Sequence, residues 1–302
     1  MAYDVSSLSS YSKEVGQDIL KAVFYHGQST KYARIVSGVG ASFKIPKLSN
    51  SVVLQADGCD LSTSATTSFE QITLTPCSLA YVNYLCKKDL DNYFLSEYLP
   101  ASKMKNDEIP FEQQLIEDIT DRISLDIERI YWSGNTSPSC TGILNKIDGA
   151  YSGSVSTVTS TVTGTPTTST IITLVDDIIT DYTFDTAKEQ SSLWMSPSNY
   201  KRLCVAYRSA NFFGGGFDFK AEEGFYIPGS INVWARSTAG ITSDDRMVCT
   251  WDKNLILGTK FEGDFTSLEV KFNEFTDIIR IKGAWSQTAD IAYPAQVSHW
   301  SV

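Results

Sequence analysis

The residues of this chain that could perform chemistry gather in one loop, which reads YWSGNTSPSCTGILN from Tyr131 to Asn145. Small polar residues between two glycines could hold a phosphate group or present a nucleophile. A phosphate-binding loop precedes a helix, so that free N–H groups and the positive end of the helix dipole face the anion. Here a long helical pattern comes first, and the loop lacks the lysine of a P-loop. The sequence therefore predicts no phosphate role for this loop.

A serine nucleophile in the same loop would need a base. Ser139 does not lie in a G-x-S-x-G elbow. The only two histidines, His26 and His299, lie near opposite ends of the chain. A catalytic triad is recognised by its geometry, which a sequence does not give. A hydrolase therefore ranks last among the functions considered, and we expect no enzyme and no catalytic residue.

Acidic residues on the long helical pattern could supply paired carboxylates for a metal ion or for glycoside hydrolysis. They are Glu112, Glu117, Asp118, Asp121, Asp126 and Glu128. A solvated helix face with this composition is far more common than a site, and the GGG run at residues 214–216 indicates a flexible loop.

The six cysteines are scattered and form no C-x-x-C pair. They are Cys59, Cys77, Cys86, Cys140, Cys204 and Cys249. A zinc site would need histidines or paired cysteines, so we expect no metal and no cofactor. The opening MAYDVSSLSS lacks the basic and then apolar order of a signal peptide. We therefore expect six free thiols in a chain that is made and kept in a reducing cytoplasm.

Composition excludes two classes of partner. The 302 residues carry a net charge of −10, which disfavours a surface that grips nucleic acid. No apolar run approaches the length that spans a bilayer, so no membrane partner is expected. An apolar share of 42% is normal for a globular chain with a real core.

Two alternating segments predict an extended β-hairpin. ASFKIPKLSNSVVLQ and TSFEQITLT alternate apolar and polar residues, and the turn-rich ADGCDLSTSATT lies between them. Pro46 fits only an edge or a bulge of such a strand. A hairpin with so little apolar surface is marginally stable alone, so it should lie against something else.

A long amphipathic helix follows over residues 107–133. Its apolar stripe comprises Leu115, Ile116, Ile119, Ile123, Ile127, Ile130 and Tyr131. Gly134 stands at a typical stop position. The Ser/Thr/Val-rich stretch over residues 151–170 is typical of a linker or exposed loop, which indicates a subdomain boundary.

A second mixed region follows this stretch. IITLVDDIITDY predicts a helix, SLWMS a short buried strand, and SPSNYKRLCVAY a helix capped by Ser196 with Pro197 in its first turn. INVWARS, RMVCTW and NLILGTKF predict strands. SLEVKFNEF and DIIRIKGAW predict long antiparallel strands with one solvated face. An arm, a projecting hairpin and a long helix leave more surface than one copy can bury, which points to assembly.

The order of these parts resembles the major capsid proteins of tailed bacteriophages, which have the Hong Kong ninety-seven type fold. The likeness covers residues 37–302. It is carried by the long helix running into YWSGNTSPSCTGIL, by FKIPKL with ITLTPCSLAYVNYLCKKDL, by SLWMSPSNYKRLCVAY, and by FTDIIRIKGAWSQTADIAYPAQVSHW. In this comparison the opening loop resembles the end of the spine helix and a turn into the next strand.

The resemblance implies an α+β fold divided as follows: residues 1–36 an N-terminal arm, 37–78 an extended hairpin loop, 79–150 a peripheral domain with the spine helix 107–133, 151–262 an axial domain, 263–288 closing strands of the peripheral domain, and 289–302 a segment returning to the axial domain. The implied assembly residues are Phe43, Lys44, Ile45, Lys47, Phe69, Ile72 and Leu74. The implied spine core is Leu115, Ile116, Ile119, Ile123, Ile127 and Ile130, and the implied axial loop is Phe213, Gly214, Gly215 and Gly216.

The function implied is a shell of hexamers and pentamers that encloses the double-stranded DNA of a tailed phage without sequence-specific binding. The implied partners are other copies of the chain, a portal and a separate scaffolding protein, since no long scaffolding segment fits before the hairpin. Such a protein is a virion component that is assembled in the cytoplasm of a bacterial host. Some relatives crosslink a hairpin lysine, but nothing identifies a partner for Lys44 or Lys47 here.

Two other non-enzymatic functions stay open. One is an encapsulin-like nanocompartment shell that encloses protein cargo. The other is a tail or adhesion protein that binds a host glycan, which the Ser/Thr-rich residues 151–170 would suit and the long helix would not.

Overall fold

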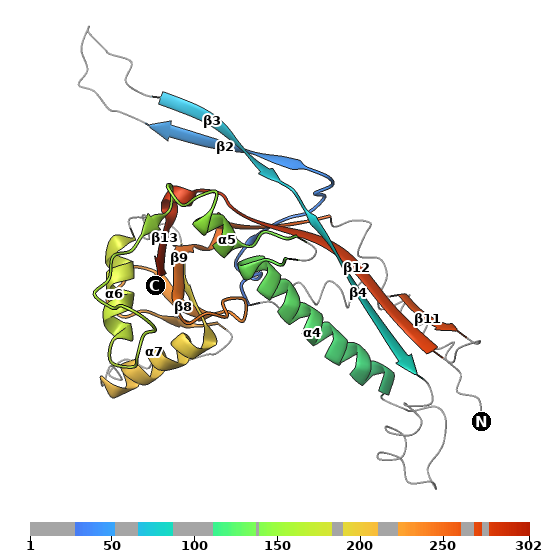
Figure 1. The fold of residues 1–302 in the computed structure, drawn as a ribbon. Helices are drawn as coiled ribbons and strands as arrows, with labels where there is room; N and C mark the ends of the chain where they lie inside the picture. The colour runs from blue at the N-terminus through green and yellow to red at the C-terminus, as the bar shows by residue number, and fades with distance from the viewer. Residues whose placement is uncertain are drawn as a thin grey trace.

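The computed structural model describes residues 28–51, 66–86, 111–136, 139–182, 190–210, 223–260, 269–273 and 278–302. His26, the tip of the predicted hairpin and the predicted axial-loop residues Phe213, Gly214, Gly215 and Gly216 lie outside these ranges. The described part is a mixed α+β structure, as predicted, with two larger sheets and a separate two-stranded ribbon (Figure 1). No helix among the described residues is long and apolar enough to cross a membrane.

The first sheet is built around one long strand. β12 (Ile278–Ile291) pairs with β4 (Cys77–Cys86) along one edge and with β10 (Leu255–Thr259) and β11 (Glu269–Asn273) along the other, all antiparallel. β1 (Arg34–Val36) adds to β10 in parallel. The predicted strand alternation is confirmed in β12, where Ile281 and Trp285 are buried and Arg280 and Lys282 are exposed.

One long helix covers the buried face of this sheet. α4 (Phe111–Ser133) lies beside β4 and β12 in Figure 1. It ends where predicted: Gly134 has φ +74°, and its N–H donates to the carbonyl of Ile130 at 2.9 Å. Ile119, Ile123 and Ile127 are buried against the sheet.

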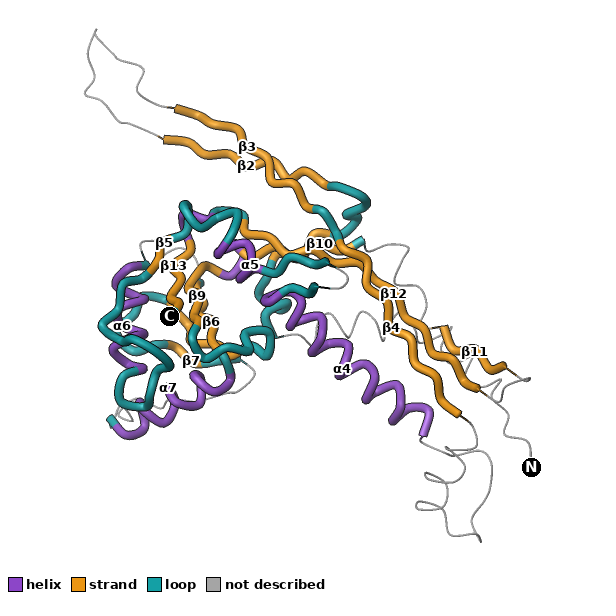
Figure 2. The backbone as a smooth tube through the Cα atoms, viewed as in Figure 1, coloured by secondary structure: helices purple, strands orange, loops and turns teal. Residues whose placement is uncertain are grey.

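The second sheet has six strands in the order β5-β13-β9-β6-β8-β7. They are β5 (Ser156–Thr157), β13 (Val297–Ser301), β9 (Arg246–Trp251), β6 (Ser191–Met195), β8 (Val233–Ser237) and β7 (Phe225–Tyr226). α6 (Ile171–Asp181) and α7 (Pro197–Ser209) pack against it (Figure 2). The cap of α7 is confirmed, because the Ser196 hydroxyl accepts a hydrogen bond from the Asn199 N–H.

The stretch over residues 151–170 is mostly exposed turn and loop, as predicted, but the short strand β5 within it pairs with β13, and Val155 and Val158 are buried. Ser, Thr and Val together also suit a strand, and composition alone cannot separate the two possibilities.

The loop after α4 leads into a helix and not into a strand. α5 (Ile143–Asp148) buries Ile143, Leu144 and Ile147, a spacing that places all three on one helical face. A short helix therefore begins at the end of the Tyr131–Asn145 stretch, so chain order does not exclude a phosphate site there, whereas the missing P-loop lysine still disfavours one. Two short 3-10 turns, Asp252–Asn254 and Pro294–Gln296, complete the described elements.

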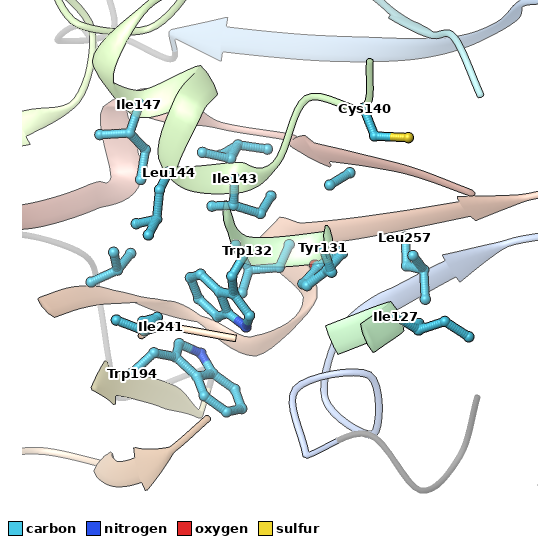
Figure 3. Close-up of a cluster of buried hydrophobic side chains, with 14 of the residues drawn as sticks. Ile127, Tyr131, Trp132, Cys140, Ile143, Leu144, Ile147, Trp194, Ile241 and Leu257 are labelled. Atoms are coloured by element: carbon cyan, nitrogen blue, oxygen red, sulfur yellow. The ribbon is translucent and has the colours of Figure 1, made fainter. Parts of the chain in front are cut away.

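The end of α4 joins the two sheets. Trp132, near the end of α4, packs against Trp194 of β6 with the two ring centroids 5.8 Å apart, and the α5 residues pack beside them (Figure 3). This cluster contains residues from both sheets, so the two sheets share one continuous core at this point.

Candidate functional site

A ribbon of two antiparallel strands projects from the described structure (Figure 1). β2 (Phe43–Ser51) and β3 (Thr66–Leu74) pair from Phe43 opposite Leu74 to Ser51 opposite Thr66. Only two residues separate β3 from β4, and the ribbon runs on alone outside both sheets (Figures 1 and 2). Pro46 therefore lies on an edge strand, as predicted.

The base of the ribbon is anchored by a small apolar cluster. Ile45 and Leu74 are buried together with Val39, Ile256 and Ala292. Gly258 allows this approach, because a Cβ there would lie 3.2 Å from a Leu74 methyl group and 2.6 Å from a Thr288 methyl group.

Burial changes the roles of two implied assembly residues. Ile45 and Leu74 are covered by their own chain, so they hold the ribbon in place and cannot themselves contact another copy. Ile72 is partly buried at the edge of the same cluster.

Three other implied assembly residues, Phe43, Lys44 and Phe69, stay accessible to a partner. Directly paired residues share a face of the ribbon, so Phe43 lies on the face of the cluster while Lys44 and Phe69 lie on the opposite face. Phe69 is 81% exposed and Phe43 is 39% exposed. An aromatic side chain that is so exposed on a projecting ribbon is typical of an interaction site.

Lys47 ties the ribbon to the C-terminal segment. Its ammonium nitrogen lies 3.1 Å from a carboxylate oxygen of Glu70, the residue paired with it across the ribbon. The same nitrogen lies 4.9 Å from the ring centre of Tyr293. Lys47 is therefore already engaged within the chain, whereas Lys44 is exposed.

A groove of about 490 Å³ runs between the ribbon and the body. Asp290 lies on the body side and is buried. It accepts hydrogen bonds from Lys146 at 2.6 Å and from the Tyr151 hydroxyl at 2.7 Å. Burial and the Asp290 charge raise the pKa of Tyr151 well above its usual range, so the hydroxyl stays protonated and donates. The groove wall is thus a fixed polar cluster.

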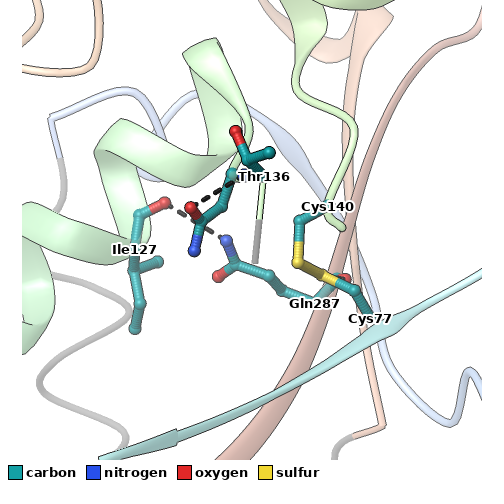
Figure 4. Close-up of a disulfide and its surroundings, with 6 residues drawn as sticks. Cys77, Ile127, Thr136, Cys140 and Gln287 are labelled. Carbon is teal, nitrogen blue, oxygen red and sulfur yellow. Dashed lines mark hydrogen bonds between the residues drawn. A yellow bond between two sulfur atoms is a disulfide. The ribbon is translucent and has the colours of Figure 1, made fainter. Parts of the chain in front are cut away.

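A disulfide joins the ribbon's base to the loop after α4. Cys77 and Cys140 are bonded, with their Cα atoms 5.6 Å apart (Figure 4). The prediction of six free thiols was therefore wrong. The two residues are 63 positions apart, and no spacing rule could pair them. Cys204 and Cys249 are free.

A buried carboxylate anchors the segment before β1. Glu128 of α4 accepts hydrogen bonds from the Ser29 N–H at 3.0 Å, the Ser29 hydroxyl at 2.8 Å and the Thr238 hydroxyl at 2.6 Å. The Trp132 indole donates to the same Ser29 hydroxyl at 3.0 Å. Residues 28–33 are thereby held to the helix and to the second sheet together.

A buried arginine completes this anchor. Arg236 is 3% exposed and its guanidinium lies 3.3 Å from the ring centre of Tyr32. It donates to both carboxylate oxygens of Asp252 at 2.9 Å and also to the Ser192 hydroxyl. A paired and stacked guanidinium satisfies the charge that burial would otherwise penalise. No local residue pattern indicated the pairing of Arg236 with Asp252.

No protein-family model matches the sequence, and no curated protein matches it either. Solved structures do match it over nearly the whole chain. The capsid of an empty GTA particle has a TM-score of 0.59 at 15% identity, over 91% of this chain and 90% of that one. A chain of the satellite phage P4 procapsid has a TM-score of 0.58 at 12% identity, over 94% of this chain and 98% of that one. The capsid of Myoviridae phage XM1 has a TM-score of 0.55 at 14% identity, over 89% of both chains.

This chain has the fold of phage major capsid proteins. The family resemblance of the sequence is confirmed at the level of the fold. The solved structures that share this fold are described as capsids and a procapsid. The capsid-type fold places the stripe residues Ile119, Ile123 and Ile127 in the core and Ile130 at its edge. Leu115 and Ile116 lie within α4, but their side chains are outside the described set.

Ser139 and His299, which were weighed as a nucleophile and a base, lie in different parts of the fold. Ser139 is exposed at the rim of the loop after α4, and His299 is buried in β13 of the second sheet. The Nε2 atom of His299 has no hydrogen-bond partner among the described residues. Within those residues, no cluster of three or more His, Cys, Asp or Glu side chains could hold a metal ion.

Replacing Glu128 with Ala should destabilise the protein by about 3 kcal/mol, because three hydrogen-bond donors lose a buried acceptor. Glu128→Gln keeps an acceptor oxygen in the same place, so it should lower the unfolding free energy clearly less than Glu128→Ala does. Urea unfolding of both variants measures the difference. Equal losses for the two variants would show that these hydrogen bonds are not what Glu128 contributes.

The stability of the protein should depend on pH through His299. Burial, together with the charge of Arg246, lowers the pKa of His299 to about 4, and Asp148 opposes this shift. The pKa of the imidazole in the unfolded chain is about 6.5. Between about pH 6.5 and 4, His299 is therefore protonated in the unfolded chain but stays neutral in the folded chain.

The contribution of His299 is therefore complete above pH 6.5 and is lost as the pH falls, by up to about 3 kcal/mol. His299→Gln should flatten the unfolding free energy against pH over this interval. Parallel curves for the variant and the parent would mean that the buried imidazole does not resist protonation.

Proposed function

We propose that this chain is a major capsid protein that assembles into the hexamers and pentamers of an icosahedral shell around the double-stranded DNA of a tailed phage. The observation that carries the proposal is a likeness to capsid structures over about nine tenths of the chain. On this proposal the ribbon β2–β3 is the extended loop, α4 is the spine helix, and the second sheet with α6 and α7 is the axial domain. The segment before residue 37 is the N-terminal arm.

The exposed face of the ribbon supports assembly through this element. Covering a phenylalanine that is exposed to the extent of Phe69 contributes about 2 kcal/mol. In a closed shell each copy places its ribbon on one neighbour and is contacted by the ribbon of another, so this stabilisation recurs at every interface. The accessible Lys44 on the same face adds a charge that can select the partner surface.

The net charge of −10 supports a shell that encloses DNA without gripping it. One neighbour, the P4 procapsid, was solved with a size determination protein. A separate scaffolding protein and a portal are the corresponding partners here, and the particle would be a virion that is built in the host cytoplasm. The likeness to capsid structures over about nine tenths of the chain favours the shell over the glycan-binding alternative.

Electron microscopy of the purified protein tests the proposal. We expect closed shells with five-fold and six-fold capsomers. Nuclease-resistant DNA in particles from infected cells would distinguish a phage capsid from a nanocompartment, whose contents would be protein. A protein that stays monomeric across concentration and salt, with or without a co-expressed scaffold, would contradict the shell.

A further inference from the structure

The Cys77–Cys140 disulfide is placed where it controls the direction of the ribbon. Cys77 begins β4, three residues after the ribbon ends at Leu74. Cys140 lies in the turn between α4 and α5 (Figure 4). The bond therefore joins the first residue of β4, just after the ribbon, to the turn at the end of α4, although the two cysteines are 63 positions apart in the sequence.

The other described attachments of the ribbon to the body are weak in comparison. They consist of the small cluster around Ile45 and Leu74 and the contact of Lys47 with Tyr293. The ion pair of Lys47 with Glu70 lies within the ribbon and fixes nothing outside it. Without the disulfide, the angle between the ribbon and α4 would depend on this small cluster, on the Lys47–Tyr293 contact and on the two-residue connection between β3 and β4.

The disulfide is also open to reagents on one side. A cavity of about 230 Å³ is lined by both cysteines. Thr73, Thr75 and Ser139 stand exposed at its edge. Cys77 is partly exposed, whereas Cys140 is only 4% exposed. A small thiol or disulfide can therefore reach the Cys77 sulfur before the Cys140 sulfur.

We propose that Cys77 and Cys140 form a redox-gated clamp on the ribbon, which is open as two thiols while the chain is made and assembles in a reducing cell and is closed as a disulfide once the particle meets oxidising surroundings. Disulfides are rare in reducing compartments and persist outside them. The timing rests on the proposed function, because it requires a shell that is built in a cell and then released. The clamp itself rests only on the placement of the two cysteines.

The closing step is thiol–disulfide exchange with an oxidised low-molecular-weight disulfide, RSSR. The thiolate of Cys77 attacks one sulfur of RSSR, which forms a mixed disulfide and releases RS⁻. The thiolate of Cys140 then attacks the Cys77 sulfur, forms the internal bond and releases the second RS⁻. RSSR gains two electrons, the cysteine pair loses two, and the two thiol protons end on the two RSH products.

While the two thiols are free, the ribbon can change its orientation relative to the body as it binds a neighbouring copy. Formation of the disulfide then fixes the orientation that the ribbon has reached. Cross-linking residues 63 positions apart removes conformations from every opened state of this region. In the released particle, the disulfide therefore reduces local unfolding at the base of the ribbon in every copy.

Alkylation of free thiols inside the producing cells tests when the Cys77–Cys140 disulfide forms. N-ethylmaleimide is added before lysis, and mass spectrometry reads the modification of Cys77 and Cys140. We expect both residues alkylated in the cell, and both joined in purified protein after exposure to oxidised glutathione. A Cys77–Cys140 peptide already joined in the trapped cells would overturn the gating by compartment.

Hydrogen exchange of the purified full-length chain tests the clamp, whether or not shells form. Reduction should speed exchange in β2 and β3 near Ile45 and Leu74 at least about tenfold, and should leave the buried strand β6 unchanged. Cys140→Ser should show the fast exchange with or without reductant. Cys204→Ser, which removes a free thiol, should respond to reductant as the parent does.

The outcomes separate the clamp from the shell. Equal exchange at the ribbon base before and after reduction would overturn the clamp even if shells form normally. A clear redox response in a protein that never forms shells would keep the clamp and contradict the proposed function.

Discussion

Replacing residues 50–67 with an Asn-Gly turn should leave a folded, soluble subunit that forms no closed shells. The exchange joins Ser49 to Ser68, which already face each other across the ribbon, and a two-residue turn of this type closes a hairpin without a register shift. The anchors at the base of the ribbon, Ile45, Leu74 and the disulfide, all remain. Only the outer part of the ribbon, which has no described contact with the body, is lost.

Electron microscopy measures assembly, and urea unfolding measures the stability of the subunit. We expect an unfolding free energy within about 1 kcal/mol of the parent, because the deletion removes no residue of the described core. Normal shells from this variant would show that the outer ribbon takes no part in assembly. Loss of the fold itself would show that this part stabilises the subunit, contrary to the structure.

A pair of point variants narrows the same test to one side chain. Phe69→Asp places a charge on a residue that is 81% exposed, so it should spare the subunit and abolish or weaken shell formation. Phe69→Tyr keeps the ring and should still form shells. If both variants assemble equally well, Phe69 does not lie in an interface between copies.

The second large effect is expected at the middle of α4. Ile123→Asp should unfold the protein or make it insoluble, because Ile123 is 4% exposed in the core between α4 and the first sheet. An unpaired carboxylate in that position costs several kcal/mol, in addition to the lost packing of the isoleucine. A single change of this size removes a large part of the stability of a typical domain.

Leu125→Asp is the matched control for this variant. Leu125 lies two residues further along the same helix and is 57% exposed. The same substitution there should change the unfolding free energy by no more than about 0.5 kcal/mol. Thermal unfolding followed by circular dichroism compares the two. Similar melting temperatures for both variants would contradict the orientation of the helix.

Local periodicity carried most of the information about the elements. The stripe that contains Ile119, Ile123 and Ile127 predicted both the helix and the face that it buries, because helical spacing places these residues on one side. The alternation in β12 predicted a strand with one solvated face for the same reason. The positions of Ser196 and Gly134 located a helix start and a helix end, since each type satisfies a specific backbone need.

Short or compositionally ambiguous segments were predicted less well. α5 has only six residues, so its apolar spacing gave too little pattern to separate a helix from a strand. β5 is a two-residue strand within a Ser/Thr-rich stretch, and it exists because β13 offers it an edge. Both depend on neighbours that come from elsewhere in the chain.

The sequence by itself determined the α+β character, the long helix, the hairpin strands and the acidic charge, because each of these follows from the type and spacing of residues close together in the chain. Only the tertiary structure decided which distant residues meet. It paired Cys77 with Cys140, placed Glu128 beside Ser29 at a separation of 99 residues, and buried Ile45 and Leu74 while leaving Phe69 exposed. Contacts of this kind arise from the packing of whole elements, and the spacing of residues along the chain does not specify which distant elements pack together.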